Sequence, residues 1–176
     1  MKKTARMALL VALLAALLCA SGCVGQQPAQ QPAQQPTQKS AQKDMPARTQ
    51  VQSLSDVPDA LNKVLPMLPN CNLHVSQVDN RCVVYNGKGE VGFIEFYPDD
   101  DSFAVFSPKI DADNYESVST TVNMMIAVTM ACNASLDVNA AKMLVASLVE
   151  NDELRDGGVN YTVGTQYDHN VIRVEL

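Results

Sequence analysis

Apolar and polar residues alternate in patterns that divide the chain from residue 56 onwards into helices and strands. Between residues 57 and 68 the apolar positions recur every three or four residues, as on one face of a helix. Asp56 precedes this segment and Pro58 lies in its first turn, so we expect Asp56 to be the N-cap. Pro66 and Pro69 are expected to end the helix, because proline has no backbone N–H to donate.

Four short strands are predicted after this helix, over residues 73–79, 82–85, 91–97 and 102–107. The sequence Asn-Gly-Lys-Gly at residues 86–89 is a strong hairpin signal between the second strand and the third. The third strand, VGFIEFY, is apolar on both faces, so we expect it in the interior of a sheet. A proline and three aspartates at residues 98–101 predict the turn before the fourth strand.

The helical period returns at residues 114–132 and 138–150, with Asp113 and Asp137 as the expected N-caps. The second half of the longer helix, MMIAVTMAC, is apolar nearly all round and should be buried on several sides. Methionines on such helices either form adaptable binding grooves or fill a core, and we expect the core. The methionines concerned are Met124, Met125, Met130 and Met143.

Two further strands, at residues 159–167 and 171–176, follow a Gly-Gly break and form a closing hairpin. The predicted order is therefore α-ββββ-αα-ββ. Strands in runs joined by tight turns indicate an antiparallel sheet with helices packed on one face. We expect an α+β fold with about six strands.

The first residues follow a different pattern. Lys2, Lys3 and Arg6 precede an apolar run over residues 7–18. This run is shorter than the roughly 20 residues that a membrane-spanning helix needs. A basic end, a short apolar core and small residues after it are typical of a secretory signal peptide. We therefore expect residues 1–22 to be a signal peptide and the protein to be exported.

The residues that end this signal, Ala20-Ser21-Gly22-Cys23, resemble the lipobox of bacterial lipoproteins, with Ala20 where Leu is commonest. The resemblance implies cleavage after Gly22 and a diacylglyceryl thioether on Cys23. Acyl chains would then hold the protein on the cell membrane or the outer membrane, outside the cytoplasm. Val24 favours the outer membrane, because lipoproteins that stay in the inner membrane commonly carry Asp there. The alternative is ordinary signal cleavage, which leaves Cys23 as a free thiol.

Residues 23–55 are predicted to form a disordered tether. They contain the near-repeat QQPAQQPAQQPTQ and few apolar residues, so they cannot bury a core. The prolines of the repeat are four residues apart, which favours a spacer over a proline-motif ligand. A chain of this length spans roughly 30 Å as a coil and about 100 Å when extended. The single folded domain then covers residues 56–176.

Charge limits the partners of this domain. The chain has 13 Lys and Arg against 19 Asp and Glu, and signal cleavage removes three bases and no acid, which leaves a net charge of −9. So acidic a protein is repelled by nucleic acid and by anionic lipid head groups. We therefore exclude nucleic acid as a partner.

Three cysteines lie in the predicted domain. Cys71 and Cys82 flank one strand, and export to an oxidising compartment permits a disulfide that closes a ten-residue loop between them. Cys132 lies in the apolar helix, and we expect it to be a small buried hydrophobic residue. The odd number leaves open a pairing of Cys132 or an intermolecular bridge.

The candidate chemistry is sparse. Cys132, His169 and Asp168 could be named as a nucleophile, base and orienting group, but no motif places them together. Cys71 and His74 are too few for a metal site, and the acidic clusters at 99–101 and 111–116 lack the glycine of a calcium loop. We predict no catalytic residue, no metal and no cofactor.

These observations favour a lipid-anchored, non-catalytic domain that binds a protein, peptide or small ligand in the bacterial cell envelope. One alternative is an envelope enzyme that uses Cys132 or a carboxylate. Another is a structural component that associates with itself through the edge of its sheet.

Overall fold

The computed structural model describes residues 51–78 and 81–176, so the predicted signal peptide, Cys23 and most of the predicted tether lie outside the described residues. Its strands are β1 (His74–Val78), β2 (Arg81–Asn86), β3 (Gly89–Tyr97), β4 (Ser102–Pro108), β5 (Glu153–Asp156), β6 (Val159–Gln166) and β7 (His169–Glu175). Its α-helices are α2 (Val57–Val64), α3 (Tyr115–Cys132) and α4 (Val138–Asn151), and the 3-10 turns are η1 (Leu54–Asp56), η2 (Leu65–Met67) and η3 (Pro98–Asp100).

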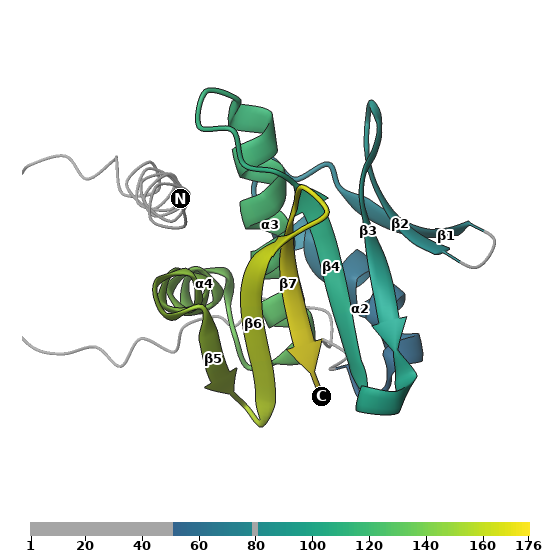
Figure 1. The fold of residues 1–176 in the computed structure, drawn as a ribbon, viewed down its shortest axis with the longest axis vertical. Coiled ribbons are helices and arrows are strands. Elements are labelled where there is room, and N and C mark those ends of the chain that lie inside the picture. Colours follow the sequence, from purple (N-terminus) through teal and green to yellow (C-terminus); the bar gives the residue numbers. More distant parts are fainter. Residues whose placement is uncertain (1–50, 79–80) are drawn as a thin grey trace, which may run out of the picture.

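The strands form one antiparallel sheet in the order β1-β2-β3-β4-β7-β6-β5, with β3 in its interior as predicted. In Figure 1, β4, β7 and β6 lie in front of α3, and α2 lies behind the same sheet. The predicted α+β class with an antiparallel sheet is confirmed, but the sheet has seven strands rather than six. The missed strand, β5, has only four residues, Glu-Leu-Arg-Asp, and pairs with β6 at the sheet edge.

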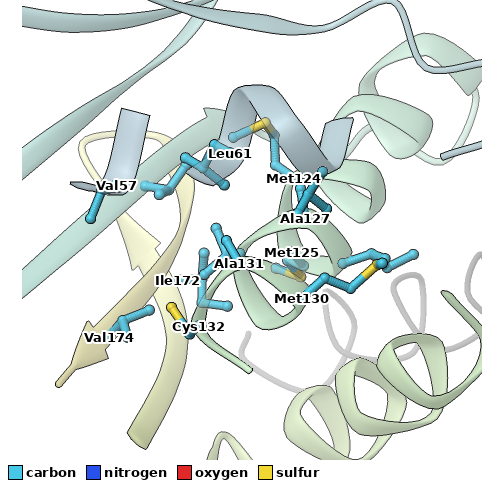
Figure 2. Packing of buried hydrophobic residues seen from close by; sticks show 14 of the residues in the cluster. Val57, Leu61, Met124, Met125, Ala127, Met130, Ala131, Cys132, Ile172 and Val174 are labelled. Atoms are coloured by element: carbon cyan, nitrogen blue, oxygen red, sulfur yellow. The ribbon is translucent and has the colours of Figure 1, made fainter. Parts of the chain in front are cut away.

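Helix α3 is the centre of the hydrophobic core. Thirteen of its 18 residues are buried, because α2, α4 and β4 all pack against it. Figure 2 shows residues of α2, α3 and β7 converging there. Met124, Met125 and Met130 are buried as predicted.

The prediction for Met143 was wrong, because 69% of this residue is exposed. The buried residues of α4 include Ala141 and Val145. Met143 lies two positions from each of them, and successive helical residues turn by about 100°, so its side chain points to the opposite side of the helix.

The helix caps differ from the prediction in two places. Asp56 lies inside η1 and does not cap α2; its carboxylate accepts hydrogen bonds from the Ser53 backbone N–H at 3.0 Å and from the Ser53 hydroxyl at 2.9 Å. Asn114, rather than Asp113, caps α3. Its side-chain oxygen accepts hydrogen bonds from the backbone N–H groups of Glu116 and Ser117. Asp137 caps α4 as predicted. Adjacent Asp and Asn residues are both good caps, so the sequence alone did not choose between Asp113 and Asn114.

Candidate binding surface on the open face of the sheet

The sheet carries a second hydrophobic cluster on the face opposite the main core. Successive residues of a strand point to opposite faces. Ile172 of β7 therefore joins the main core, whereas Val171 joins a cluster made of strand residues only. We call this second side the open face. Its cluster comprises Ala104, Phe106 and Val171, with Phe93 and Tyr97 packed against them.

The strand register arranges the open face in rows. One row crosses β3, β4, β7 and β6 through Phe93, Phe106, Val171 and Gly164. The Phe93 and Phe106 rings are stacked with their centroids 4.4 Å apart and their planes 9° apart. His169 packs its ring edge against both. Phe106 is fully buried in this row and Val171 is 8% exposed, whereas Phe93 is half-buried, so Phe93 and His169 are the ring-bearing residues of the row that reach the surface. The row ends at Gly164, a residue without a side chain.

The neighbouring row is polar and contains Arg173. Its guanidinium group donates to the Asp100 carboxylate at 2.9 Å and to the Ser102 hydroxyl at 3.0 Å. The guanidinium carbon lies 4.9 Å from the centre of the Tyr97 ring. Tyr97 in turn donates to Glu95 at 2.6 Å, and this hydrogen bond raises the pKa of its phenol. Arg173 is therefore held in place, although no described residue accepts from its buried Nε.

A hollow of about 200 Å³ lies over β4, β7 and β6 beside Arg173. Ala104, Val171 and Gly164 are small or medium-sized and leave it open. A Cβ atom built on Gly164 would meet no other atom within 4 Å. The polar residues of the lining are Tyr97, Thr162, Thr165, Gln166 and Arg173. Sites for drug-sized ligands are usually larger, from about 300 Å³ upwards, so this hollow suits a group of the size of one side chain.

The end of the open face beside Arg173 is acidic. Asp99, Asp100 and Asp101 are exposed in the turn between β3 and β4. Glu175 of β7 pairs with Ser102, which places it beside the same turn. The first 50 residues hold six of the 13 bases and one of the 19 acids, so residues 51–176 carry seven bases and 18 acids, a net charge of −11. Carboxylates thus outnumber bases at this end of the open face.

The structure does not bring together the three residues that could have formed a nucleophilic site. Cys132 is buried in the main core at the end of α3, and this burial raises the pKa of its thiol to about 12. His169 and Asp168 lie at the β6–β7 turn, where His169 packs on the open face and Asp168 pairs with Lys109. A thiol that stays protonated at neutral pH is a weak nucleophile.

Cys71 and Cys82, the residues of the predicted disulfide, are both free thiols in the structure. Cys82 of β2 lies opposite Gln77, and Cys71 lies before β1 begins at His74. The disulfide between them stays a prediction.

The acidic clusters have structural roles. Asp99 and Asp100 belong to η3, and Asp111 accepts a hydrogen bond from the backbone N–H of Asp113 ahead of α3. His74 stacks on Tyr85. Within residues 51–78 and 81–176, no group of three or more His, Cys, Asp or Glu side chains could hold a metal ion. In the same part of the chain, no helix combines the length and apolar character needed to cross a membrane.

Comparisons with known proteins give no relative. No family model matches the chain, and no match is found among curated proteins or solved structures. The open face was missed in the sequence, although a signal existed: β3 and β4 both carry large apolar residues at odd and even positions. A strand that is apolar on both faces has a second surface to cover, either within the fold or with a partner.

Proposed function

We propose that the chain is a lipid-anchored, non-catalytic binding domain of the bacterial cell envelope, and that the open face is its binding surface. The observation that carries this proposal is the hollow lined by Tyr97 and Arg173, beside the half-buried Phe93, whose ring stacks on the buried Phe106. Aromatic residues and arginine are enriched in the buried centres of protein interfaces. An apolar surface with polar surroundings is a common mark of an interaction site.

The buried state of Cys132 supports a binding role over catalysis. This thiol was the candidate nucleophile of the enzyme alternative, and it is 1% exposed. His169, the candidate base, uses its ring to pack on Phe93 and Phe106. These positions favour structural roles for both residues.

The anchor is proposed from the resemblance of residues 20–23 to a lipobox. The test is the intact mass of the full-length protein purified from the membrane of a lipoprotein-processing bacterium. We expect a chain that begins at Cys23 and carries diacylglycerol, and we expect Cys23→Ser to abolish the modification. An unmodified chain from the wild-type gene would contradict the anchor and leave an exported domain.

The binding surface is tested by site-specific photo-crosslinking in the anchored protein. A photoreactive amino acid replaces exposed Gln166, at the rim of the hollow, or exposed Met143, on α4, as the matched control. We expect discrete adducts from position 166 and none from position 143. The same adducts from both positions, or none from position 166, would contradict the assignment of the open face.

A further inference from the structure

We propose that the hollow of the open face takes one bulky apolar side chain from a positively charged segment of another envelope protein. This inference rests on the proposed binding role of the open face and names the chemistry of the partner. It follows from two separate properties of the surface, the size and lining of the hollow and the charge beside it.

Part of the hollow is apolar and can contact an apolar side chain. Ala104 and Val171 are apolar and Gly164 has no side chain, so a leucine, methionine or phenylalanine of a partner would contact apolar atoms there. Its volume of about 200 Å³ matches one such group rather than a larger ligand. The hydroxyl group of Thr162 lies on the β6 side, on the same face as Gly164, where the main chain of a partner segment can hydrogen-bond with it. An apolar anchor in a pocket with a polar rim is the usual arrangement of an interface hot spot.

The acidic end selects positive charge next to that anchor. The carboxylates of Asp99, Asp101 and Glu175 are exposed there. Arg173 already pairs with Asp100, and a second base, the exposed Arg155 of β5, lies in the row of Glu175 on the far side of Asn160. Acids therefore still outnumber bases at this end. Lysine or arginine residues that flank the anchor would gain attraction, whereas an acidic segment would be repelled. A second copy of this chain would bring the same acidic end and a net charge of −11 over residues 51–176. Charge therefore favours a basic partner over self-association.

The chain itself offers a competing segment. Residues 39–48 carry Lys39, Lys43 and Arg48 against one acid, Asp44, with Met45 between them. This stretch ends close to Val51, the first described residue. A test must therefore separate a segment of another protein from the chain's own residues 39–48.

The test uses the full mature chain with Cys23→Ser, labelled with ¹⁵N, and three synthetic peptides. The probe peptide has one central phenylalanine flanked by lysines. One matched peptide replaces the phenylalanine with glycine, and the other replaces the lysines with glutamates. We expect the probe alone to shift the backbone amide signals of Gly164, Thr165 and Arg173, in a saturable manner and less strongly at high salt.

Two variants of the protein sharpen the result. Gly164→Val adds a side chain at the hollow whose Cβ meets no atom within 4 Å, so we expect it to abolish the shifts and leave the rest of the spectrum unchanged. Asp99→Asn with Asp101→Asn removes two charges. Asp101 has a left-handed backbone conformation (φ 47°) that asparagine tolerates, so we expect a several-fold weaker binding of the lysine peptide without loss of folding.

Several results would overturn the inference. The glutamate peptide could bind equally well, or the probe could fail to shift these signals. If replacing Lys39, Lys43 and Arg48 with glutamine moves the Gly164 signal without any peptide, the chain's own segment occupies the hollow. A dimer in light scattering that Gly164→Val dissociates would assign it to a second copy. If crosslinking at position 166 succeeds while the lysine peptide fails, the binding role stands and only the partner chemistry falls.

Discussion

Gly92 in the middle of β3 gives the sharpest prediction about the sheet that supports the open face. A Cβ atom built on this buried residue would lie 2.2 Å from the Phe106 carbonyl oxygen and 3.3 Å from the Phe106 carbonyl carbon. Both atoms belong to the backbone of β4, so no side-chain rotation relieves the contact. We therefore expect Gly92→Ala to push β3 and β4 apart.

The cost follows from the size of this overlap. Carbon–oxygen contacts in sheets usually lie at about 3.3–3.6 Å, so the strands would have to separate by about 1 Å. Overpacking of this kind costs about 1–3 kcal/mol, and each ladder hydrogen bond that is lost adds about 1 kcal/mol. We expect Gly92→Ala to lower the free energy of unfolding by about 3 kcal/mol, a large share of the 5–15 kcal/mol typical of a domain.

Urea unfolding of the full mature chain, followed by circular dichroism, measures this loss. With a slope of about 1.5 kcal/mol per molar urea, the midpoint should fall by about 2 M. The matched control is Gly164→Ala on β6, where the added Cβ meets no atom within 4 Å. This control should change stability little, or raise it by about 0.5 kcal/mol because alanine has less freedom in the unfolded chain. Equal midpoints for wild type and Gly92→Ala would refute the close approach of β3 and β4.

The remaining predictions concern buried groups and one carboxylate. Tyr161→Phe should raise the free energy of unfolding by about 1 kcal/mol, because the buried hydroxyl has no hydrogen-bond partner among the described residues. A lower melting temperature of this variant would instead reveal a hydrogen-bond partner, with the Cys132 thiol as the candidate. Iodoacetamide at pH 8 should label half-buried Cys71 in the native protein and Cys132 only after unfolding. Mass spectrometry of the labelled peptides measures this difference. Rapid labelling of Cys132 in the native protein would contradict its burial. The hydrogen bonds from Ser53 and Gln52 lower the pKa of Asp56. The stability they supply is present above the ordinary pKa of Asp and is lost as pH falls through the lowered value. The difference in melting temperature between wild type and Asp56→Asn should therefore be full near pH 6 and shrink below about pH 4; a constant difference would contradict it.

Much of the fold could be predicted because local patterns agree with the tertiary structure. The turn at residues 86–89 was predicted, and the structure supplies the reason: the Asn86 side chain accepts hydrogen bonds from the backbone N–H groups of Lys88 and Gly89. The nearly uniform apolar character of MMIAVTMAC predicted burial on several sides, and α3 is surrounded by α2, α4 and β4. These features depend on residues close together in the chain.

The features that depend on distant residues were not predicted. The open face forms because β7 pairs with β4 and with β6, so that Phe106, Val171 and Gly164 share one row. No local pattern specifies that pairing. The lipid on Cys23 stays a prediction from the lipobox-like residues alone.

The central claim is that the open face binds a partner through its hollow. The most direct measurement is photo-crosslinking from position 166 in the full-length protein, expressed in a lipoprotein-processing bacterium, with and without Gly164→Val. We expect this substitution to abolish the adducts and to leave the melting temperature unchanged or slightly higher, because the added side chain enters open space. Adducts that persist unchanged in a folded Gly164→Val protein would contradict the claim.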